Sequence, residues 1–220
     1  MRLNIFLLVV MVIVVPARFA FAGSPFLCPI AVNSVHGNAL ALVNDTIQWN
    51  GQTGKLIRHQ FTVMSKNVND YQKISAPVTY WGAWRWEVVL DVNKEVDRSF
   101  SMSCLVPLVT DDARFLILLK TGPAFGPVLR IYRKGDSSIR MEDGSIRGVL
   151  VREIKLDELW PEGKIESFWS DHTPEWFAGG SFDFPEDNLH LIHKTRWETT
   201  FRIDLQDGRV LKEYDMSFPN

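Results

Sequence analysis

The stretch TIQWNGQTGKLIRHQFTV, residues 46–63, decides the fold class because strand-forming residues flank a turn at its centre. Its two arms, residues 46–49 and 55–63, are rich in β-branched and aromatic side chains, which favour strands. The residues between them, Asn50 to Gly54, include an Asn-Gly pair, and both residue types accept the positive φ angles of tight turns. The stretch therefore predicts an antiparallel hairpin.

Turns of the same kind recur along the chain. Residues 129–133 lead into a Lys-Gly-Asp turn at 134–136, after which a strand resumes near Gly148. Residues 201–214 contain a Gln-Asp-Gly turn between two further strand-like arms. Three hairpins in one chain, with few helix signals, predict an all-β fold.

Alternation of apolar and polar side chains supports this fold class. Residues 84–88 and 199–206 place apolar side chains at every second position, which is typical of strands with one buried face. Residues 115–119 are apolar at every position, so we expect a central strand that is covered on both faces.

Three segments resemble the blades of β-propellers. Residues 45–55 resemble the outer hairpin of a blade, and residues 111–117 and 201–209 are similar to other blade pieces. The resemblance covers about a fifth of the chain after residue 22, and the Gly-His signature of the WD40 class is absent. It implies antiparallel, blade-like sheets in an irregular or partial β-propeller. A twisted β-sandwich is the alternative that the same strands fit.

The first 22 residues have the pattern of a signal peptide. Arg2 precedes an unbroken apolar run at 5–15, and the small-x-small sequence Ala20-Phe21-Ala22 precedes Gly23. We therefore expect cleavage between Ala22 and Gly23. The run is about half of the roughly 20 residues that a membrane-spanning helix needs.

This pattern sets the expected organisation of the chain. Residues 1–22 are the signal peptide, and residues 23–220 form a single β-rich domain that is exported to a periplasmic or extracellular location. No later apolar stretch approaches membrane-spanning length, so we expect no stable membrane span after cleavage. Removing Arg2 and Arg18 from 24 basic side chains, against 26 acidic ones, gives a net charge of −4. That mild acidity argues against a nucleic-acid partner.

The two cysteines, Cys28 and Cys104, both follow the predicted cleavage site. In an oxidising compartment two thiols most simply form one disulfide. The alternative is a pair of buried free thiols, because unpaired cysteine packs well in cores.

The sequence contains no recognised motif for catalysis, metal binding or cofactor binding, so we expect no catalytic residue, metal or cofactor. His190 and His193 share the spacing His-x-x-His, but the segment has the pattern of a strand, where a three-residue step places them on opposite faces.

Aromatic side chains are the better candidates for binding, because flat rings stack on sugars and on peptide side chains. We select Trp81, Trp176 and Phe177 as ligand-binding candidates.

These observations give two functional hypotheses. The first is a non-catalytic, exported β-repeat domain that binds a protein or glycan in the cell envelope. The second is a secreted hydrolase that acts on glycans through acidic loop residues. It requires two carboxylates in one cleft, about 5–10 Å apart. Its candidates are Asp171, Glu175, Asp183 and Glu186.

Overall fold

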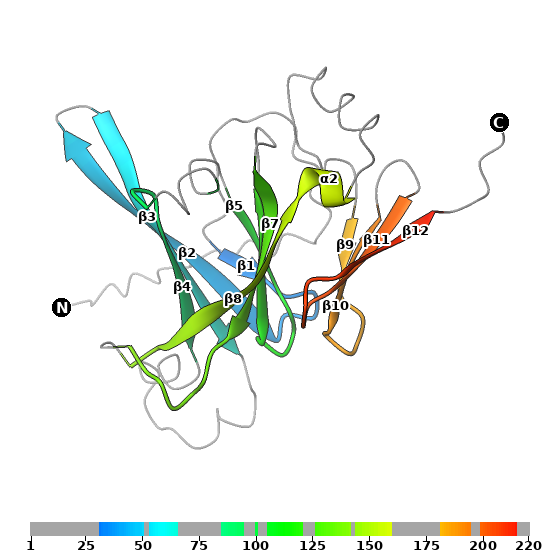
Figure 1. Cartoon of the computed structure of the whole chain (residues 1–220). Coiled ribbons are helices and arrows are strands. Elements are labelled where there is room, and N and C mark those ends of the chain that lie inside the picture. Colours follow the sequence, from blue (N-terminus) through cyan, green and yellow to red (C-terminus); the bar gives the residue numbers. More distant parts are fainter. Residues whose placement is uncertain are drawn as a thin grey trace, which may run out of the picture.

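The computed structural model contains two β-sheets and a helical turn in the residues that it describes (Figure 1). These residues are 31–50, 53–65, 85–94, 100, 105–120, 126–141, 144–159, 181–194 and 199–214. The all-β fold class expected from the turns and the alternation is confirmed.

The first sheet has eight strands in the order β1-β2-β3-β4-β8-β7-β6-β5. They are β1 (Ala31–Asn33), β2 (Ala39–Asn50), β3 (Thr53–Ser65), β4 (Trp86–Asp91), β5 (Leu105–Val109), β6 (Phe115–Lys120), β7 (Pro127–Lys134) and β8 (Ile146–Lys155). The sheet curls until its edge strands β1 and β5 lie near each other, so it is nearly closed into a barrel-like shape (Figure 1). All neighbouring strands are antiparallel except β4 and β8, which are parallel.

The second sheet has four antiparallel strands in the order β12-β11-β10-β9. They are β9 (Ser181–Asp183), β10 (His190–Lys194), β11 (Thr199–Asp204) and β12 (Val210–Tyr214). The helical turn α2 (Leu156–Leu159) directly follows β8. This sheet has the strand number of one propeller blade, whereas the first sheet is twice that size.

The hairpin predicted from residues 46–63 is confirmed as β2 and β3. It is longer than expected, because pairing runs from Asn50↔Thr53 at the turn to Ala39↔Ser65 at the far end, with one register shift after Thr46. Only part of this ribbon belongs to the wall of the barrel-like sheet, and its turn end projects beyond it (Figure 1).

Two hydrophobic cores lie on opposite faces of the first sheet. The inner core fills the barrel-like sheet, and Phe61, Trp86 and Leu116 are fully buried there. The outer core lies between strands β5–β8 and the second sheet. Strand β6 contributes to both: Ile117 belongs to the outer core and Leu118 to the inner core. All six residues of β6 are buried, so the prediction of a strand covered on both faces is confirmed.

Within the described ranges, no helix is long and apolar enough to cross a membrane.

Candidate binding site

The residues selected from the sequence as functional lie outside the described residues. These are the ligand-binding candidates Trp81, Trp176 and Phe177, the cysteines Cys28 and Cys104, and the cleavage site Ala22–Gly23. Asp171 and Glu175 of the hydrolase hypothesis lie outside them as well. These assignments therefore stay predictions, and the site described below comes from other residues.

The first sheet opens between β4 and β8. These strands pair at only two positions, Trp86↔Ile146 and Glu87↔Arg147. Beyond them, β4 pairs only with β3 and β8 only with β7. We call the opening between Val88–Asp91 of β4 and Gly148–Glu153 of β8 the seam.

Two local features mark the point where β8 turns away from β4. The register between β7 and β8 shifts between Ile131 and Tyr132, which leaves Val151 without an opposite residue. A bulge of this kind bends the strand and increases its twist. The strand leaves β4 at Gly148, where the absence of a side chain lets β8 lie against Trp86 and Val88. The seam thus begins directly after the close packing at Gly148 and contains the bulge of β8.

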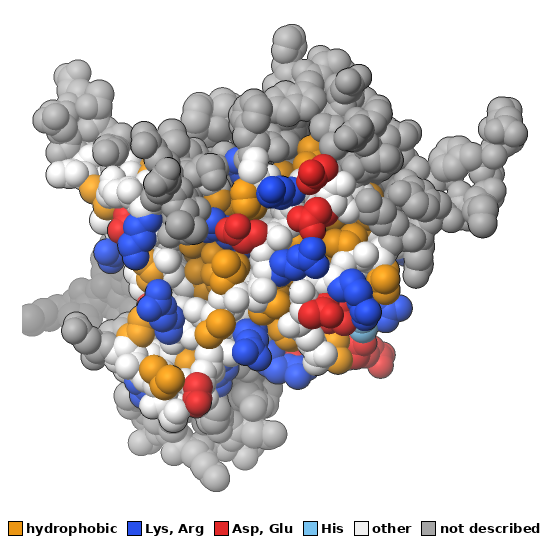
Figure 2. Space-filling model, viewed as in Figure 1, with side chains coloured by type: hydrophobic (Ala, Val, Ile, Leu, Met, Phe, Trp, Pro, Cys, Tyr) orange, Lys and Arg blue, Asp and Glu red, His pale blue; other side chains and the backbone are white. Residues whose placement is uncertain are grey.

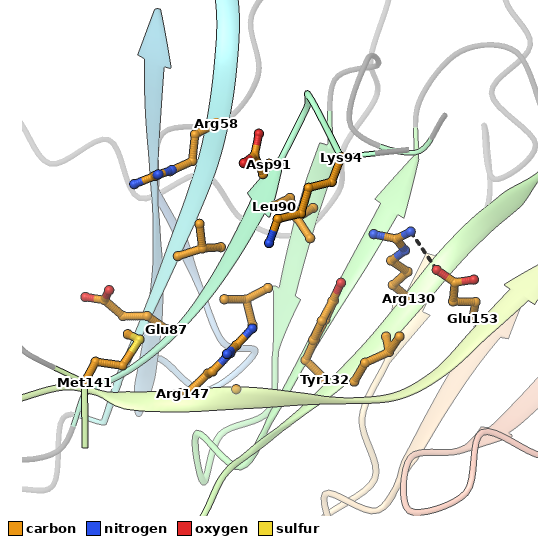
Figure 3. Close-up of a pocket in the computed structure, with 14 residues that line it drawn as sticks. Arg58, Glu87, Leu90, Asp91, Lys94, Arg130, Tyr132, Met141, Arg147 and Glu153 are labelled. Atoms are coloured by element: carbon orange, nitrogen blue, oxygen red, sulfur yellow. Dashed lines mark ion pairs between the residues drawn. The ribbon is translucent and has the colours of Figure 1, made fainter. Parts of the chain in front are cut away.

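A cavity of about 330 Å³ occupies the seam (Figure 3). Its apolar wall comes from the inward face of the sheet, where Val88, Leu90 and Tyr132 are almost fully buried. Leu150 lies opposite Tyr132 in the register and therefore on the same inward face, yet it is 43% exposed. The charged lining residues are Arg58, Glu87, Asp91, Lys94, Arg130, Arg147 and Glu153.

Arg130 is the deepest charge of the cavity. Its side chain is 2% exposed, and Nη2 lies 2.6 Å from Oε1 of Glu153, which is 33% exposed. The guanidinium carbon lies 4.4 Å from the ring centre of Phe100, a cation–π contact. Lys120 is also buried, and burial followed by the nearby charge of Arg130 lowers the pKa of its ammonium group. Two basic side chains, Arg130 and Lys120, are therefore buried at this end of the inner core.

Glu87 is buried, although its odd position among alternating residues predicted an outward, solvated side chain. The reason is local hydrogen bonding on the outer face of β3 and β4. Gln60 Nε2 donates to Glu87 Oε2 at 2.6 Å, and Thr62 Oγ1 donates to Oε1 at 3.4 Å. Arg85 Nε lies 3.7 Å from Oε1. The negative charge of Glu87 is thus already engaged within the sheet.

Three other cations of the seam have no such partners. In the described part of the chain, no side-chain hydrogen bond or ion pair is formed by Arg58 of β3, Lys94 after β4 or Arg147 of β8. Figure 3 shows the side chains of Lys94 and Arg147 directed toward the middle of the cavity, with the Arg130–Glu153 pair on the side of β7 and β8. The cavity thus combines an apolar wall with available positive charge.

Apolar side chains continue over the surface beside the seam. Val89 and Val149 are 41% and 44% exposed, and Ile139 is 69% exposed. A second cavity of about 380 Å³ adjoins the first and shares Arg147, Gly148 and Leu150 with it. Figure 2 shows apolar side chains gathered between β4 and β8, with Lys and Arg side chains around them.

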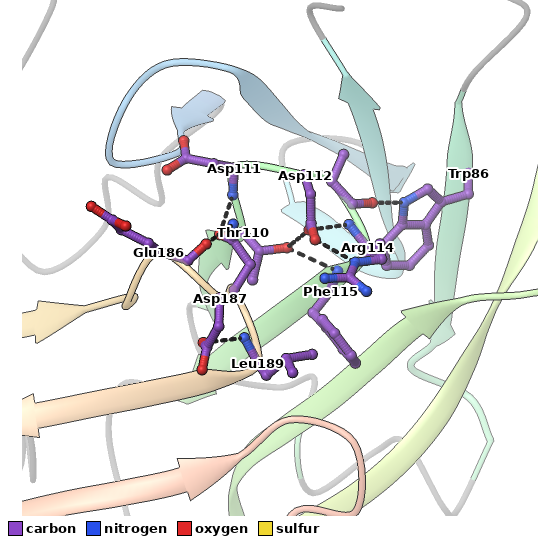
Figure 4. Close-up of polar contacts among 11 residues, drawn as sticks. Trp86, Thr110, Asp111, Asp112, Arg114, Phe115, Glu186, Asp187 and Leu189 are labelled. Atoms are coloured by element: carbon purple, nitrogen blue, oxygen red, sulfur yellow. Dashed lines mark hydrogen bonds and ion pairs between the residues drawn. The ribbon is translucent and has the colours of Figure 1, made fainter.

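A second polar cluster lies at the β5–β6 turn, where the two sheets meet (Figure 4). The amide of Asp111 donates to Asn188 Oδ1 of the β9–β10 turn at 3.1 Å. The Asp111 carboxylate accepts from the His36 ring and, at 3.0 Å, from the His36 amide. Burial raises the pKa of Asp111, but hydrogen bonds from Ser34 and His36 outweigh it, so the net shift is downward.

The acids of the hydrolase hypothesis that the structure describes belong to this cluster. Asp183 and Glu186 are exposed, and their charges add to that of Asp111 in raising the pKa of His36. Neither of them lines the two cavities of the seam. Among the described residues, no group of three or more His, Cys, Asp or Glu side chains is placed to hold a metal ion.

His190 and His193 lie on opposite faces of β10, as their spacing predicted. His193 is buried with the outer core and stacks on Phe182, with ring centres 4.3 Å apart. His190 contacts Asp187 on the other face, with Nδ1 3.0 Å from Oδ2. Burial lowers the pKa of His193 to about 4, so its ring is neutral in the folded protein at neutral pH. The pair is structural.

Sequence reasoning did not identify the seam. Its unpaired cations come from three separate segments and share no motif. The alternation in residues 55–63 places Arg58 on the outward face but does not show what it faces. Only the topology, with β8 returning beside β4, brings Arg58, Lys94 and Arg147 together.

No family model, curated protein or solved structure matches this chain.

Proposed function

We propose that this chain is an exported, non-catalytic binding domain that holds an anionic ligand in the seam. The observation that carries the proposal is a set of three cations around a cavity with an apolar wall. Arg58, Lys94 and Arg147 form no side-chain hydrogen bond or ion pair among the described residues. A cavity of about 330 Å³ is in the size range of ligand sites, which are mainly apolar with a few placed polar groups.

The charge at the seam differs from that of the whole chain. The full sequence has a formal net charge of −2, so general attraction of polyanions is not expected. The cavity lining holds four cations, Arg58, Lys94, Arg130 and Arg147, and three acids, Glu87, Asp91 and Glu153. Among the acids, Glu153 pairs with Arg130, Glu87 accepts from Gln60, and Asp91 accepts from the amide of Asn93. An anionic group of a ligand would balance the remaining excess of one positive charge in the lining.

The wider setting of the proposal comes from the sequence. The signal-peptide pattern at residues 1–22 supports a periplasmic or extracellular location, and there we propose a protein or glycan of the envelope as the ligand class. The relationship to β-propeller blades is proposed for the second sheet alone, because β9–β12 are four antiparallel strands in sequential order.

The test measures binding of two anionic probes to the purified protein by isothermal titration calorimetry at low salt. One probe is oligoglutamate and the other is oligogalacturonate. We expect at least one probe to bind. The double variant Arg58→Gln/Arg147→Gln should weaken binding about fivefold or more, because each solvent-accessible ion pair contributes up to about 1 kcal/mol.

The matched control is Arg133→Gln. Arg133 is an exposed arginine on neighbouring β7, and it lines neither seam cavity. Its variant should bind like the wild type. Absence of binding by both probes, or equal losses in the seam and control variants, would overturn the proposal.

A further inference from the structure

We infer that the ligand of the seam is an extended acidic peptide segment of another protein, which adds as a strand to the open edge of β8. The inference rests on the proposed function, because it names the ligand class for the same site. It adds that the backbone of β8 takes part in recognition, together with the cations Arg58, Lys94 and Arg147.

The open edge follows from the topology. β8 pairs with β7 from Gly148 to Lys155, but with β4 only at Ile146 and Arg147. Successive residues of a strand direct their N–H and C=O groups to alternate sides. Half of these groups between Gly148 and Glu153 therefore point into the seam, where no strand of the described chain pairs with them. Such an edge is a template for another strand.

Leu150 shows that a neighbour is missing on this edge. It lies on the inward face opposite Tyr132, which is 6% exposed, whereas Leu150 is 43% exposed. Inward positions of a nearly closed sheet are covered by the side chains of adjacent strands. A strand added beside β8 would cover Leu150 with one of its own inward side chains.

The two faces of the seam predict the sequence of the added strand. Its inward side chains would meet Val88, Leu90 and Leu150, which are apolar. Its outward side chains would lie among Arg58 and Arg147, which are exposed, with Lys94 at the end of β4. Because side chains of a strand alternate between faces, the best ligand alternates apolar and acidic residues. A peptide fits these features better than an acidic glycan. A glycan has no ladder of backbone N–H groups and no apolar side chains at every second position.

The experiment uses a capped heptapeptide of alternating valine and glutamate as the probe, with the purified full chain. Binding is measured by calorimetry at low salt. Two further peptides carry N-methyl groups on alternate amides, one in each register. We expect the parent peptide to bind and one methylated register to weaken binding about tenfold or more, because two or three ladder hydrogen bonds are lost. Amide hydrogen exchange should show new protection at Gly148–Glu153 and none in β11.

A pair of variants tests the apolar contact. Leu150→Ser should weaken binding of the peptide about fivefold or more through lost apolar burial. The matched control is Leu211→Ser, since Leu211 is 44% exposed on β12 and lies outside the seam. Its variant should bind like the wild type.

The outcomes separate this inference from the proposed function. If both methylated peptides bind as tightly as the parent, or if only oligogalacturonate binds, strand addition is overturned while the anion site stands. If no anionic probe binds, both the proposed function and the inference of strand addition are overturned. If sedimentation of the protein alone shows a dimer that Leu150→Ser abolishes, a second copy occupies the edge, and the inference of a foreign peptide is overturned.

Discussion

The indole of Trp86 lies directly against the backbone of Gly148, so that a Cβ at position 148 would be 2.8 Å from Cζ3 and 2.9 Å from Cε3 of the ring. The same indole donates from Nε1 to the carbonyl of Ala113 at 2.7 Å, in the turn between β5 and β6 (Figure 4). Trp86 thus links the point where β8 leaves β4 to the opposite side of the inner core.

Gly148→Ala should lower the free energy of unfolding by about 1–3 kcal/mol, because the added methyl group overpacks a filled core. It would also lie 2.6 Å from Cγ2 of Val88. Urea unfolding followed by tryptophan fluorescence measures the change. Val149→Thr, at an exposed neighbouring position, should stay within about 0.5 kcal/mol of the wild type. Equal stability of the two variants would contradict the close packing at Gly148.

Glu153→Gln tests the buried charge of the cavity. Arg130 is 2% exposed, and its ion pair with Glu153 is 2.6 Å long. Removing the negative charge should cost about 2–3 kcal/mol, below the 3–5 kcal/mol of fully buried pairs because Glu153 is partly exposed. The matched control is Glu158→Gln. Its pair with Arg152 is also 2.6 Å long but 39% and 33% exposed, so the loss should be under about 1 kcal/mol. Thermal unfolding of both variants at neutral pH makes the comparison.

The strands of this fold were predictable where the local pattern carried the information. The hairpin at 46–63, the central strand at 115–119 and the alternation at 199–206 are all present as β2–β3, β6 and β11. In each case the spacing of apolar residues shows which faces of the strand are buried. Alternation indicates one buried face, and a continuous apolar run indicates two. The Gln-Asp-Gly turn expected at residues 206–208 lies between β11 and β12.

The seam was not predictable, because it depends on how distant strands are ordered. The parallel neighbours β4 and β8 are separated by the antiparallel strands β5–β7 in sequence, and no local pattern specifies that pairing. The same holds for Glu87. Its burial depends on Gln60 and Thr62 of the neighbouring strand, so alternation alone assigned it to solvent.

His193 should make the protein less stable in mild acid. Burial lowers its pKa to about 4 from an ordinary value of 6.5, so between these values the unfolded chain binds more protons than the folded one. The contribution of neutral His193 to the free energy of unfolding is therefore fully present above pH 6.5. It falls as the pH drops toward 4, by on the order of 3 kcal/mol over the whole window. Urea unfolding between pH 4.5 and 7.5 measures the slope. His193→Phe, which keeps a ring between Phe182 and Phe201, should flatten it, and an unchanged slope would show that other groups cause the acid loss.

His36 and Asp111 should stabilise the contact between the β1–β2 turn and the β5–β6 turn only within a defined pH window. The hydrogen bond and the charge of Asp111 raise the pKa of His36 above 6.5, and the pKa of Asp111 lies below 3.8. A raised histidine pKa stabilises the fold at low pH, and this contribution is lost as the pH rises through the folded pKa. A lowered aspartate pKa acts in the opposite direction: its stabilising contribution is lost as the pH falls through the pKa of the folded state.

The difference in melting temperature between the wild type and His36→Gln should therefore be largest between about pH 4 and 6.5 and should shrink above pH 6.5. Asp183→Asn, which removes a more distant charge, should lower the His36 pKa only slightly. An NMR titration of the His36 ring measures that pKa directly, and a value at or below 6.5 in the folded wild-type protein would show that the His36–Asp111 pair does not form in solution.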